Sequence, residues 1–283
     1  MSSKKAVLLI MDGLGDLPMA RTADRSRQSG SHQLPATPKT PLQAAKKPNL
    51  DRLAKEGITG LLSPVGRGII PGSDTSHLEI LGYPPAIFYC GRGPLEALGT
   101  GMALEEQDVA FRANFATVEN GKVVDRRAGR IDSEEARKLE KYLSTKIEDV
   151  QVIFKHSVQH RGAVVLRGNG LSPDVGDTDP HESGQIIPCR ECEKSDAAKK
   201  TARIVNAYMK FAMEKLSAAP ENRERTAKKL RPANALLLRG AGVYRKIPSM
   251  IERFGLNAAC MADGALYRGV ATYIGMDVFM LKG

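Results

Sequence analysis

Two short runs of this sequence contain the residue types that nucleophilic attack on phosphorus requires. Asp12 follows the apolar run Ala-Val-Leu-Leu-Ile-Met, and Ser73 lies in the run Pro-Gly-Ser-Asp-Thr-Ser-His. A serine hydroxyl becomes a useful nucleophile when its pKa is lowered, and a divalent cation bound to its oxygen has this effect. Asp12 could supply an anionic ligand for that cation. Gly72 would allow the backbone to approach an anion closely, and the first amides of a following helix would point at it.

Each of these residues also has a simpler structural interpretation. Asp12-Gly13 is a common turn pair, and Ser73 could cap the N-terminus of a helix. His77, four residues further on, could be a packed or a surface histidine. The residue types alone therefore leave both interpretations open.

Both candidate residues would be positioned by predicted strands. The apolar run 6–11 predicts a buried parallel strand that ends at Asp12, and residues 58–64 predict a second strand that leads through a loop to Ser73. Because sites in open α/β sheets gather at the carboxyl ends of the strands, we expect both side chains at one sheet edge.

The rest of the sequence predicts further elements. The helix at residues 48–57 should end with Gly57 in the left-handed conformation, and 249–281 should resume a helix-strand-helix-strand rhythm. The other predictions are a flexible loop at 21–39, strands at 108–118, 152–154, 162–166 and 233–238, and helices at 133–143 and 195–216. These alternations favour an α/β fold with a small inserted α+β domain.

Several sequence blocks together resemble one known family. The first three are Ala-Val-Leu-Leu-Ile-Met-Asp-Gly-Leu-Gly-Asp, Lys-Thr-Pro-Leu-Gln-Ala-Ala-Lys-Lys-Pro-Asn-Leu-Asp-Arg-Leu-Ala and Pro-Gly-Ser-Asp-Thr-Ser-His-Leu, and later ones are Asp-Val-Ala-Phe-Arg-Ala-Asn-Phe-Ala-Thr, Asp-Arg-Arg-Ala-Gly-Arg and Gln-His-Arg-Gly. In this order they are similar to the archaeal-type cofactor-independent phosphoglycerate mutases of the alkaline phosphatase superfamily. The resemblance covers nearly the whole chain except the loop at residues 21–39, which looks like an insertion.

The resemblance implies a fold and a reaction. The fold is an alkaline-phosphatase-like core with a mainly parallel sheet flanked by helices, plus an inserted smaller α+β domain. Residues 1–85 would begin the metal-binding core, 86–243 would form the inserted substrate-binding domain, and 244–283 would return to the core. The reaction is the interconversion of 3-phosphoglycerate and 2-phosphoglycerate through a phosphoserine, without 2,3-bisphosphoglycerate.

The resemblance also implies roles for individual residues. Asp12 and Ser73 would ligate one of two divalent metal ions, Mn²⁺, Mg²⁺ or Zn²⁺, and Ser73 would accept the phosphoryl group. Arg268 stands where the family is expected to have a lysine, which keeps the charge and changes its geometry. A phosphorylated carboxylate also suits several guanidinium groups on physical grounds. The candidates to bind it are Arg126, Arg127, Arg130, His160, Arg161 and Arg239, and Asp125 could orient an arginine or bond a glycerate hydroxyl.

Other possible metal ligands in the sequence do not complete a site. Cys189-Arg-Glu-Cys192 supplies half of a zinc site, and His156 and His160 flank predicted strands. Asp-Thr-Asp-Pro-His at residues 177–181 could bind a cation, but the resemblance places it near the substrate. The family's later Asp and His ligands do not follow Gly283, so we expect a chain truncated at its C-terminus that shows little mutase activity with added manganese.

Composition limits the class of protein. The chain of 283 residues has 42% apolar residues and a formal net charge of +10, and much of the excess lies between residues 194 and 231. No apolar run approaches the roughly 18 residues of a membrane span, and no nucleic-acid-binding signature occurs, so a cytoplasmic protein with a small-molecule substrate is expected. Its oligomeric state is not predicted. Two alternative functions remain: a phosphatase or small-molecule kinase of the same superfamily, and a non-catalytic fragment that binds an anion or a partner.

Overall fold

The computed structural model describes residues 4–18 and 38–280, which fall into two units, 1–63 and 64–283, each described by itself. Most of the predicted loop at 21–39 lies outside the described residues. Among these residues no helix is both long and apolar enough to cross a bilayer.

The first unit contains two short helices, α1 (Pro41–Ala44) and α2 (Pro48–Glu56). Thr40 caps α1 through a capping box with Gln43. The predicted helix before Gly57 is therefore confirmed, but the prediction of a left-handed Gly57 is wrong, because its backbone is extended, with φ of −97°.

Neither strand predicted in the first unit is found. Residues 6–11 and 58–64 are assigned no strand, and Val7 and Ile58 are 95% and 104% exposed. A parallel strand gains all its ladder hydrogen bonds from neighbouring strands, so an apolar run alone does not form one. Asp12 and Gly13 lie in a turn, as the simpler interpretation predicted.

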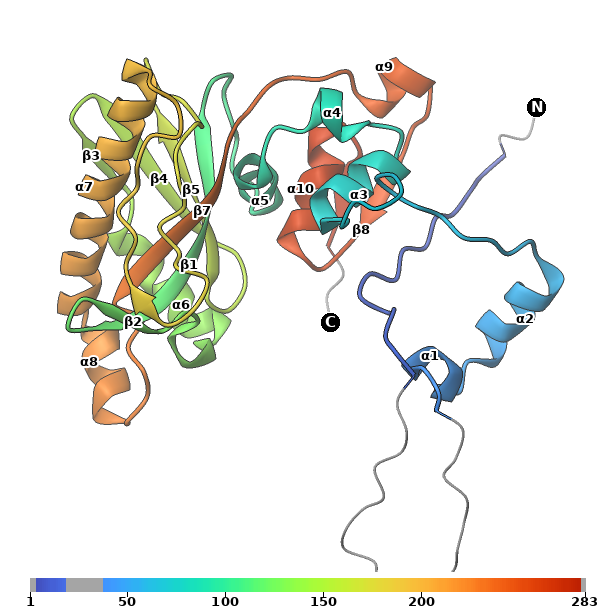
Figure 1. The fold of residues 1–283 in the computed structure, drawn as a ribbon, viewed down its shortest axis with the longest axis horizontal. Coiled ribbons are helices and arrows are strands. Elements are labelled where there is room, and N and C mark those ends of the chain that lie inside the picture. The colour runs from blue at the N-terminus through green and yellow to red at the C-terminus, as the bar shows by residue number, and fades with distance from the viewer. Residues whose placement is uncertain (1–3, 19–37, 281–283) are drawn as a thin grey trace, which may run out of the picture. The chain divides into compact units, whose positions relative to one another are not determined.

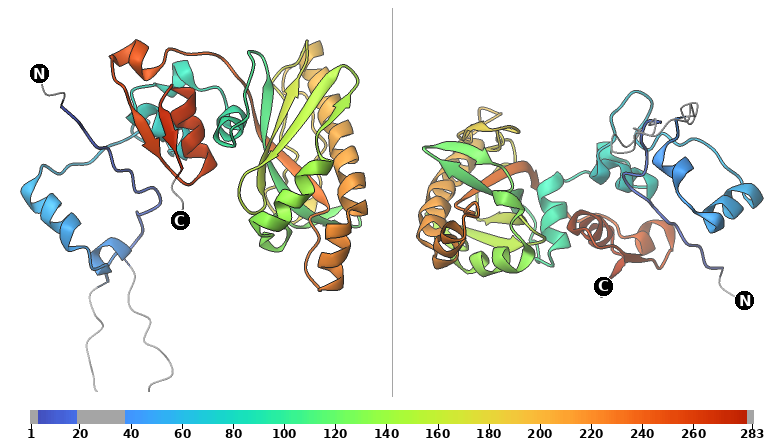
Figure 2. Two further views of the ribbon diagram at one scale, coloured as in Figure 1. Left: turned by 180° about the vertical axis from the view of Figure 1, so that it is seen from behind. Right: turned by 90° about the horizontal axis from the view of Figure 1, so that it is seen from below.

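The second unit is built around a seven-stranded, mainly antiparallel sheet (Figures 1 and 2). Its main order is β3-β4-β5-β1-β2-β6, and β7 pairs with β1. The strands are β1 (Val109–Glu119), β2 (Lys122–Asp125), β3 (Thr145–Ile147), β4 (Val150–His156), β5 (Arg161–Arg167), β6 (Gly184–Gln185) and β7 (Ala235–Val243). The four strands predicted in this region and the pairing of β4 with β5 are confirmed.

One face of this sheet is covered by helices. The largest core cluster joins alternate residues of β1, among them Phe111 and Phe115, to α6 (Ser133–Leu139) and to Ile204 and Tyr208 of α7 (Asp196–Ala218). Figure 1 shows α7 running along this face. The sheet is accompanied by the 3₁₀ turns η1 (Ala128–Arg130) and η2 (Glu140–Tyr142) and by helix α8 (Pro220–Ala227).

A second core cluster lies among shorter helices of the same unit. It contains Leu78, Leu95, Val270 and Tyr273, which come from three of these helices. The helices are α3 (Ser73–Ile80), α4 (Pro85–Phe88), α5 (Arg92–Gly99), α9 (Met250–Phe254) and α10 (Ala265–Tyr273). Strands β8 (Ala259–Met261) and β9 (Asp277–Phe279) pair in parallel, as the predicted rhythm at 249–281 requires.

The fold prediction is therefore confirmed in its coarse form and not in its detail. The described chain contains both helices and strands, but its large sheet is antiparallel. Among residues 4–18 and 38–280, the parallel pairing is that of β8 with β9. A mainly parallel sheet is not seen in this part of the chain.

Candidate functional site

The sheet face opposite α7 carries three of the seven predicted substrate-binding residues, His160, Arg161 and Arg239. Because side chains alternate along a strand, Arg112 and Asn114 of β1 point away from the α7 core that contains Phe111 and Ala113. In register with them lie Arg161 of β5, opposite Asn114, and Arg239 of β7, opposite Arg112. We call Arg112, Asn114, Arg161, Arg239 and the neighbouring His160 the arginine face.

Polar atoms on the arginine face are buried without partners. Arg112, Asn114 and His160 are 6%, 4% and 6% exposed. Arg112 Nε, Asn114 Oδ1, His160 Nδ1 and Arg239 Nε have no hydrogen-bond partner within the part of the chain that the structure describes. Burying such a group without a partner costs about 1–3 kcal/mol, so four together indicate a ligand site.

The two buried guanidinium groups disfavour each other. Arg112 and Arg239 are direct cross-strand partners, and like charges in that position are destabilising. Burial, and after it the Arg239 charge, lowers the pKa of Arg112 to about 10. The Glu96 carboxylate on α5 lies 3.8 Å from Arg112 Nε and also accepts a hydrogen bond from Arg92 at 3.2 Å. One carboxylate shared by Arg92 and Arg112 leaves the face with an excess of positive charge.

His160 is held as the neutral imidazole. Burial lowers its pKa to about 4, with further lowering by Arg161 and Arg112. Its backbone carbonyl accepts a hydrogen bond from Phe115 N at 2.7 Å, which places it beside Asn114. His156, at the end of β4, donates from Nε2 to the Gln159 carbonyl at 2.8 Å and does not join the arginine face.

The loop that carries Asp125, Arg126, Arg127 and Arg130 is a left-handed turn. Ala128, Gly129 and Arg130 have φ of 47°, 64° and 55°. The Asp125 carboxylate accepts from the backbone of Arg127 at 2.8 Å and of Gly129 at 3.0 Å. The Asp125 carboxylate therefore helps to shape this turn.

A buried arginine holds this turn from beneath. Arg225, which is 4% exposed, donates to the Ala128 carbonyl at 3.1 Å and to the Arg231 carbonyl at 3.0 Å, and it pairs with Glu135. These contacts stabilise left-handed residues, which are costly in the absence of such support.

The predicted arginines of this turn differ in whether the guanidinium group is already paired with a carboxylate. Arg126 forms a two-point ion pair with buried Asp179, at 2.7 and 2.6 Å, and donates to the His181 carbonyl. Its hydrogen bond to Asp179 raises the pKa of Arg126. Arg127 and Arg130 are exposed, and Arg127 contributes to the lowering of the His160 pKa, so Arg127 adds charge near the arginine face.

Helix α3 begins at Ser73, so the expected helix after Gly72 is found, but its N-cap is Gly72 and not Ser73. A side chain at Gly72 would meet Asp74 Oδ1 at 2.6 Å, which explains the glycine. Asp74, 6% exposed, accepts a hydrogen bond from the Tyr89 hydroxyl at 2.6 Å, and His77 Nδ1 lies 2.6 Å from the Ser73 carbonyl oxygen. The start of α3 is therefore tied down at both Asp74 and His77.

The described geometry does not test the predicted metal pair, and it ties Arg268 to backbone carbonyls. Asp12 belongs to the first unit and Ser73 to the second, so their pairing stays a prediction. Arg268 donates from Nε to the Gly99 carbonyl at 3.2 Å and also to the Asp263 carbonyl. No group of three or more His, Cys, Asp or Glu side chains that could hold a metal occurs among residues 4–18 and 38–280.

The cysteine and aspartate motifs have structural roles in this part of the chain. Cys189 is buried, Cys192 is exposed, and both are free thiols. Asp177 accepts from Gly240 N at 2.8 Å, and Thr178 pairs with Leu238. Residues 177–179 thus cover the edge of β7 and hold Arg126.

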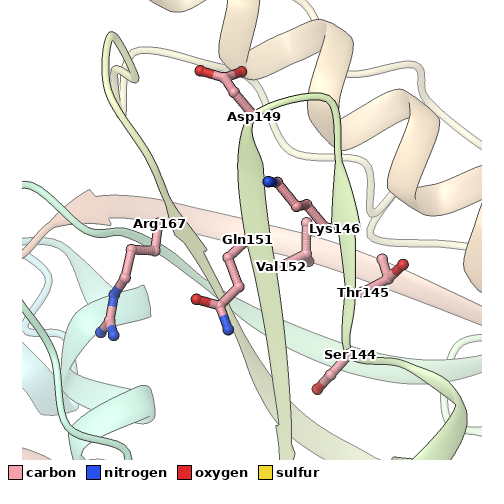
Figure 3. A pocket seen from close by; sticks show the side chains of 7 residues that line it. All are labelled: Ser144, Thr145, Lys146, Asp149, Gln151, Val152 and Arg167. Carbon is pink, nitrogen blue, oxygen red and sulfur yellow. The ribbon is translucent and has the colours of Figure 1, made fainter.

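A hollow of about 570 Å³ lies away from the arginine face, at the β3–β4 hairpin (Figure 3). Two of its charged side chains are paired: Arg167 binds Asp108, and Asp149 binds Lys200 at 2.7 Å. Lys146 also lines it.

Sequence reasoning missed Arg112 and Asn114 as site residues. Both lie in the motif Asp-Val-Ala-Phe-Arg-Ala-Asn-Phe-Ala-Thr, but neither is among the predicted substrate-binding residues. The available signal was their position: they are the polar residues that interrupt the apolar strand Val109–Ala116 two residues apart, and so share one sheet face.

Comparison with known proteins gives a consistent result. A profile described as 2,3-bisphosphoglycerate-independent phosphoglycerate mutase matches residues 54–222. Relatives with this name include one from Methanocaldococcus jannaschii, 48% identical over 100% of this chain and 66% of its own, and one from Archaeoglobus fulgidus, 46% identical over 98% and 65%.

A solved structure agrees with the sequence relatives. The cofactor-independent phosphoglycerate mutase of Thermoplasma acidophilum aligns with a TM-score of 0.62 at 40% identity, over 87% of this chain and 65% of its own. The chain thus spans about two thirds of the length of the relatives that it matches.

Proposed function

Because this chain belongs to the 2,3-bisphosphoglycerate-independent phosphoglycerate mutase family, we propose that it serves the interconversion of 3-phosphoglycerate and 2-phosphoglycerate. The observation that carries the proposal is the cross-strand pair of buried Arg112 and half-buried Arg239, whose Nε atoms lack hydrogen-bond partners among the described residues. A ligand with a phosphate and a carboxylate would supply the anions that this pair needs.

Recognition is assigned to the arginine face. Arg112 and Arg239 bind an anionic group of phosphoglycerate, and Arg161 and Arg127 add charge around it. Arg126 has a positioning role, because Asp179 occupies its guanidinium group. Arg130, which is exposed on the same turn, is a weaker candidate for contact.

Chemistry is assigned to Ser73. Its Oγ forms a bond to phosphorus, the bond between phosphorus and the glycerate oxygen breaks, and that oxygen gains the proton that the serine loses. Transfer back to the neighbouring glycerate oxygen gives the isomer and restores Ser73. Asp74 and His77 hold the first turn of α3 in place during both transfers. Arg268 stabilises the phosphoryl charge.

A divalent ion on Asp12 and Ser73 belongs to the proposal as an expectation. Such an ion would lower the pKa of the serine and neutralise phosphoryl charge. In the described part of the chain, no group of three or more His, Cys, Asp or Glu side chains could hold a metal ion. The identity of the ion, Mn²⁺, Mg²⁺ or Zn²⁺, is therefore not part of the proposal.

The fold proposal follows the family resemblance. We assign residues 1–85 and 244–283 to an alkaline-phosphatase-like core and 86–243 to the substrate-binding domain. The parallel pair β8 and β9 supports the first assignment, and the antiparallel sheet with the arginine face supports the second. The protein is proposed to act in the cytoplasm on a small molecule.

The test is a single-turnover experiment on the 283-residue chain. The protein is incubated with 3-phosphoglycerate and Mn²⁺, digested, and analysed for phosphoserine by mass spectrometry. We expect phosphoserine on Ser73 and none in Ser73→Ala. Release of glycerate and inorganic phosphate alone would favour the phosphatase alternative, and a requirement for a nucleotide donor would favour a kinase.

A further inference from the structure

The arginine face holds unpartnered atoms of two different chemical kinds. Arg112 Nε and Arg239 Nε can only donate, so they call for an anion. Asn114 carries a neutral amide, which both donates and accepts, and its Oδ1 is buried without a partner in the described chain. Two anion-binding groups do not explain why an amide lies between them and Arg161 on the same face.

The protein surroundings of Asn114 offer nothing to satisfy the amide. Its cross-strand neighbours on the arginine face are Leu237, which is apolar, and Arg161, whose side chain is exposed. With 4% of its surface exposed, Asn114 cannot rely on bulk solvent. The partner therefore has to come from a ligand that enters the face.

The ligand group that fits an amide beside guanidinium groups is a hydroxyl. A hydroxyl donates one hydrogen bond and accepts others, which matches the two functions of the amide. A phosphate or carboxylate oxygen has no proton to donate and would leave Asn114 Oδ1 without a partner. Neutral His160, whose Nδ1 is also buried without a partner among the described residues, can take the remaining lone pair or proton of the same hydroxyl.

We propose that Asn114 binds the free hydroxyl of the ligand and makes the arginine face specific for a phosphorylated hydroxy acid over the corresponding deoxy acid. This inference rests on the proposed function. Asp125, which the sequence suggested for the hydroxyl, is already used by two backbone amides, so Asn114 replaces it in that role. Asn114 would thus determine which of the two acids binds.

The experiment compares two ligands that differ by one hydroxyl. Isothermal titration calorimetry on the 283-residue chain measures binding of 3-phosphoglycerate and of 3-phosphooxypropanoate, its 2-deoxy analogue. We expect the wild-type chain to bind 3-phosphoglycerate at least about tenfold more tightly, because the analogue leaves buried polar groups unpaired. Equal affinity of the wild-type chain for both ligands would overturn the inference without any variant.

The variant Asn114→Leu tests the residue itself. Its affinity for the deoxy analogue should stay within about threefold of wild type, and the tenfold preference should disappear. If Asn114→Leu lowers the thermal midpoint, Asn114→Ala is titrated in its place with the same expectation. A preference that persists in a folded variant would overturn the inference.

Tyr208→Phe is the matched control. Tyr208 also has a buried hydroxyl without a partner in the described chain, but it lies in the core on the opposite face of the sheet. Its removal should leave the ligand preference unchanged, whereas a loss of preference in this control would overturn the assignment to Asn114. Failure of the wild-type chain to bind either ligand would instead contradict the proposed function.

Discussion

At the scale of residues, the arginine face combines groups that favour ligand binding and disfavour folding. Arg112 and Arg239 are cross-strand partners with unpartnered Nε atoms in this part of the structure, and Glu96 compensates only part of their charge. A buried charge that lacks a partner is a cost to the folded state. We therefore expect changes here to affect binding and stability in opposite directions.

The first prediction contrasts two arginines of the same sheet. Arg239→Met should leave the free energy of unfolding unchanged or raise it by about 1 kcal/mol, because a poorly partnered charge is replaced by an apolar chain. Arg167→Met should lower it by about 3 kcal/mol, because Asp108, 2% exposed, loses its two-point partner. Urea unfolding of both variants measures this. A larger loss in Arg239→Met than in Arg167→Met would contradict the account.

The second prediction concerns His160 and pH. Its pKa of about 4 in the folded chain lies below the roughly 6.5 expected when unfolded, so the unfolded chain binds more protons between these values. Stability should therefore fall as pH falls through this window, by about 2 kcal/mol between about pH 7 and pH 5. His160→Gln should remove that part of the slope, leaving a share from His156, whose pKa burial also lowers.

An unchanged pH slope of urea stability in His160→Gln would show that the imidazole is not held neutral by the fold.

At the scale of elements, α5 joins the second core cluster, through Leu95 and Leu98, to the sheet face opposite α7, where Ala97 packs with Ala110. Its N-terminal turn packs on β1, where a Cβ at Gly93 would overlap the Ala110 carbonyl. Its other side packs on α10, where a Cβ at Gly269 would overlap the Leu95 carbonyl. These glycines let α5 carry Glu96 to within 3.8 Å of Arg112.

The third prediction tests this close packing. Gly269→Ala should lower the free energy of unfolding by about 2 kcal/mol or more, because the backbones of α5 and α10 must move apart. Gly184→Ala is the matched control, since a Cβ there meets nothing within 4 Å. Chemical unfolding of the two variants should differ by most of that amount, and equal stability would contradict the packing described.

Elements with their own local signals could be predicted from the sequence. β1 and α7 were expected at 108–118 and 195–216 and are found at Val109–Glu119 and Asp196–Ala218. A continuous apolar run marks the first, and Ser195 with a 3.6-residue apolar period marks the second. The strands expected at 6–11 and 58–64 are not found, because a parallel strand is stabilised by hydrogen bonds to neighbouring strands and an apolar run does not supply them.

At the scale of the whole molecule, the family and its chemistry could be predicted, whereas the detailed site could not. Three ordered motifs identified the family, and the profile match over residues 54–222 supports it. The arginine face depends on the antiparallel register that sets Arg112 against Arg239 and Asn114 against Arg161. Register between distant strands is not encoded in any one segment, so the opposition of Arg112 to Arg239 and of Asn114 to Arg161 could not be predicted.

The most direct test of the account is a calorimetric titration of the 283-residue chain with 3-phosphoglycerate, in wild type and in the double variant Arg112→Met/Arg239→Met. The account predicts one-to-one binding that weakens by about a hundredfold in the double variant, because two charge-assisted hydrogen bonds are lost. Unchanged affinity in a double variant that unfolds at the wild-type temperature would contradict it.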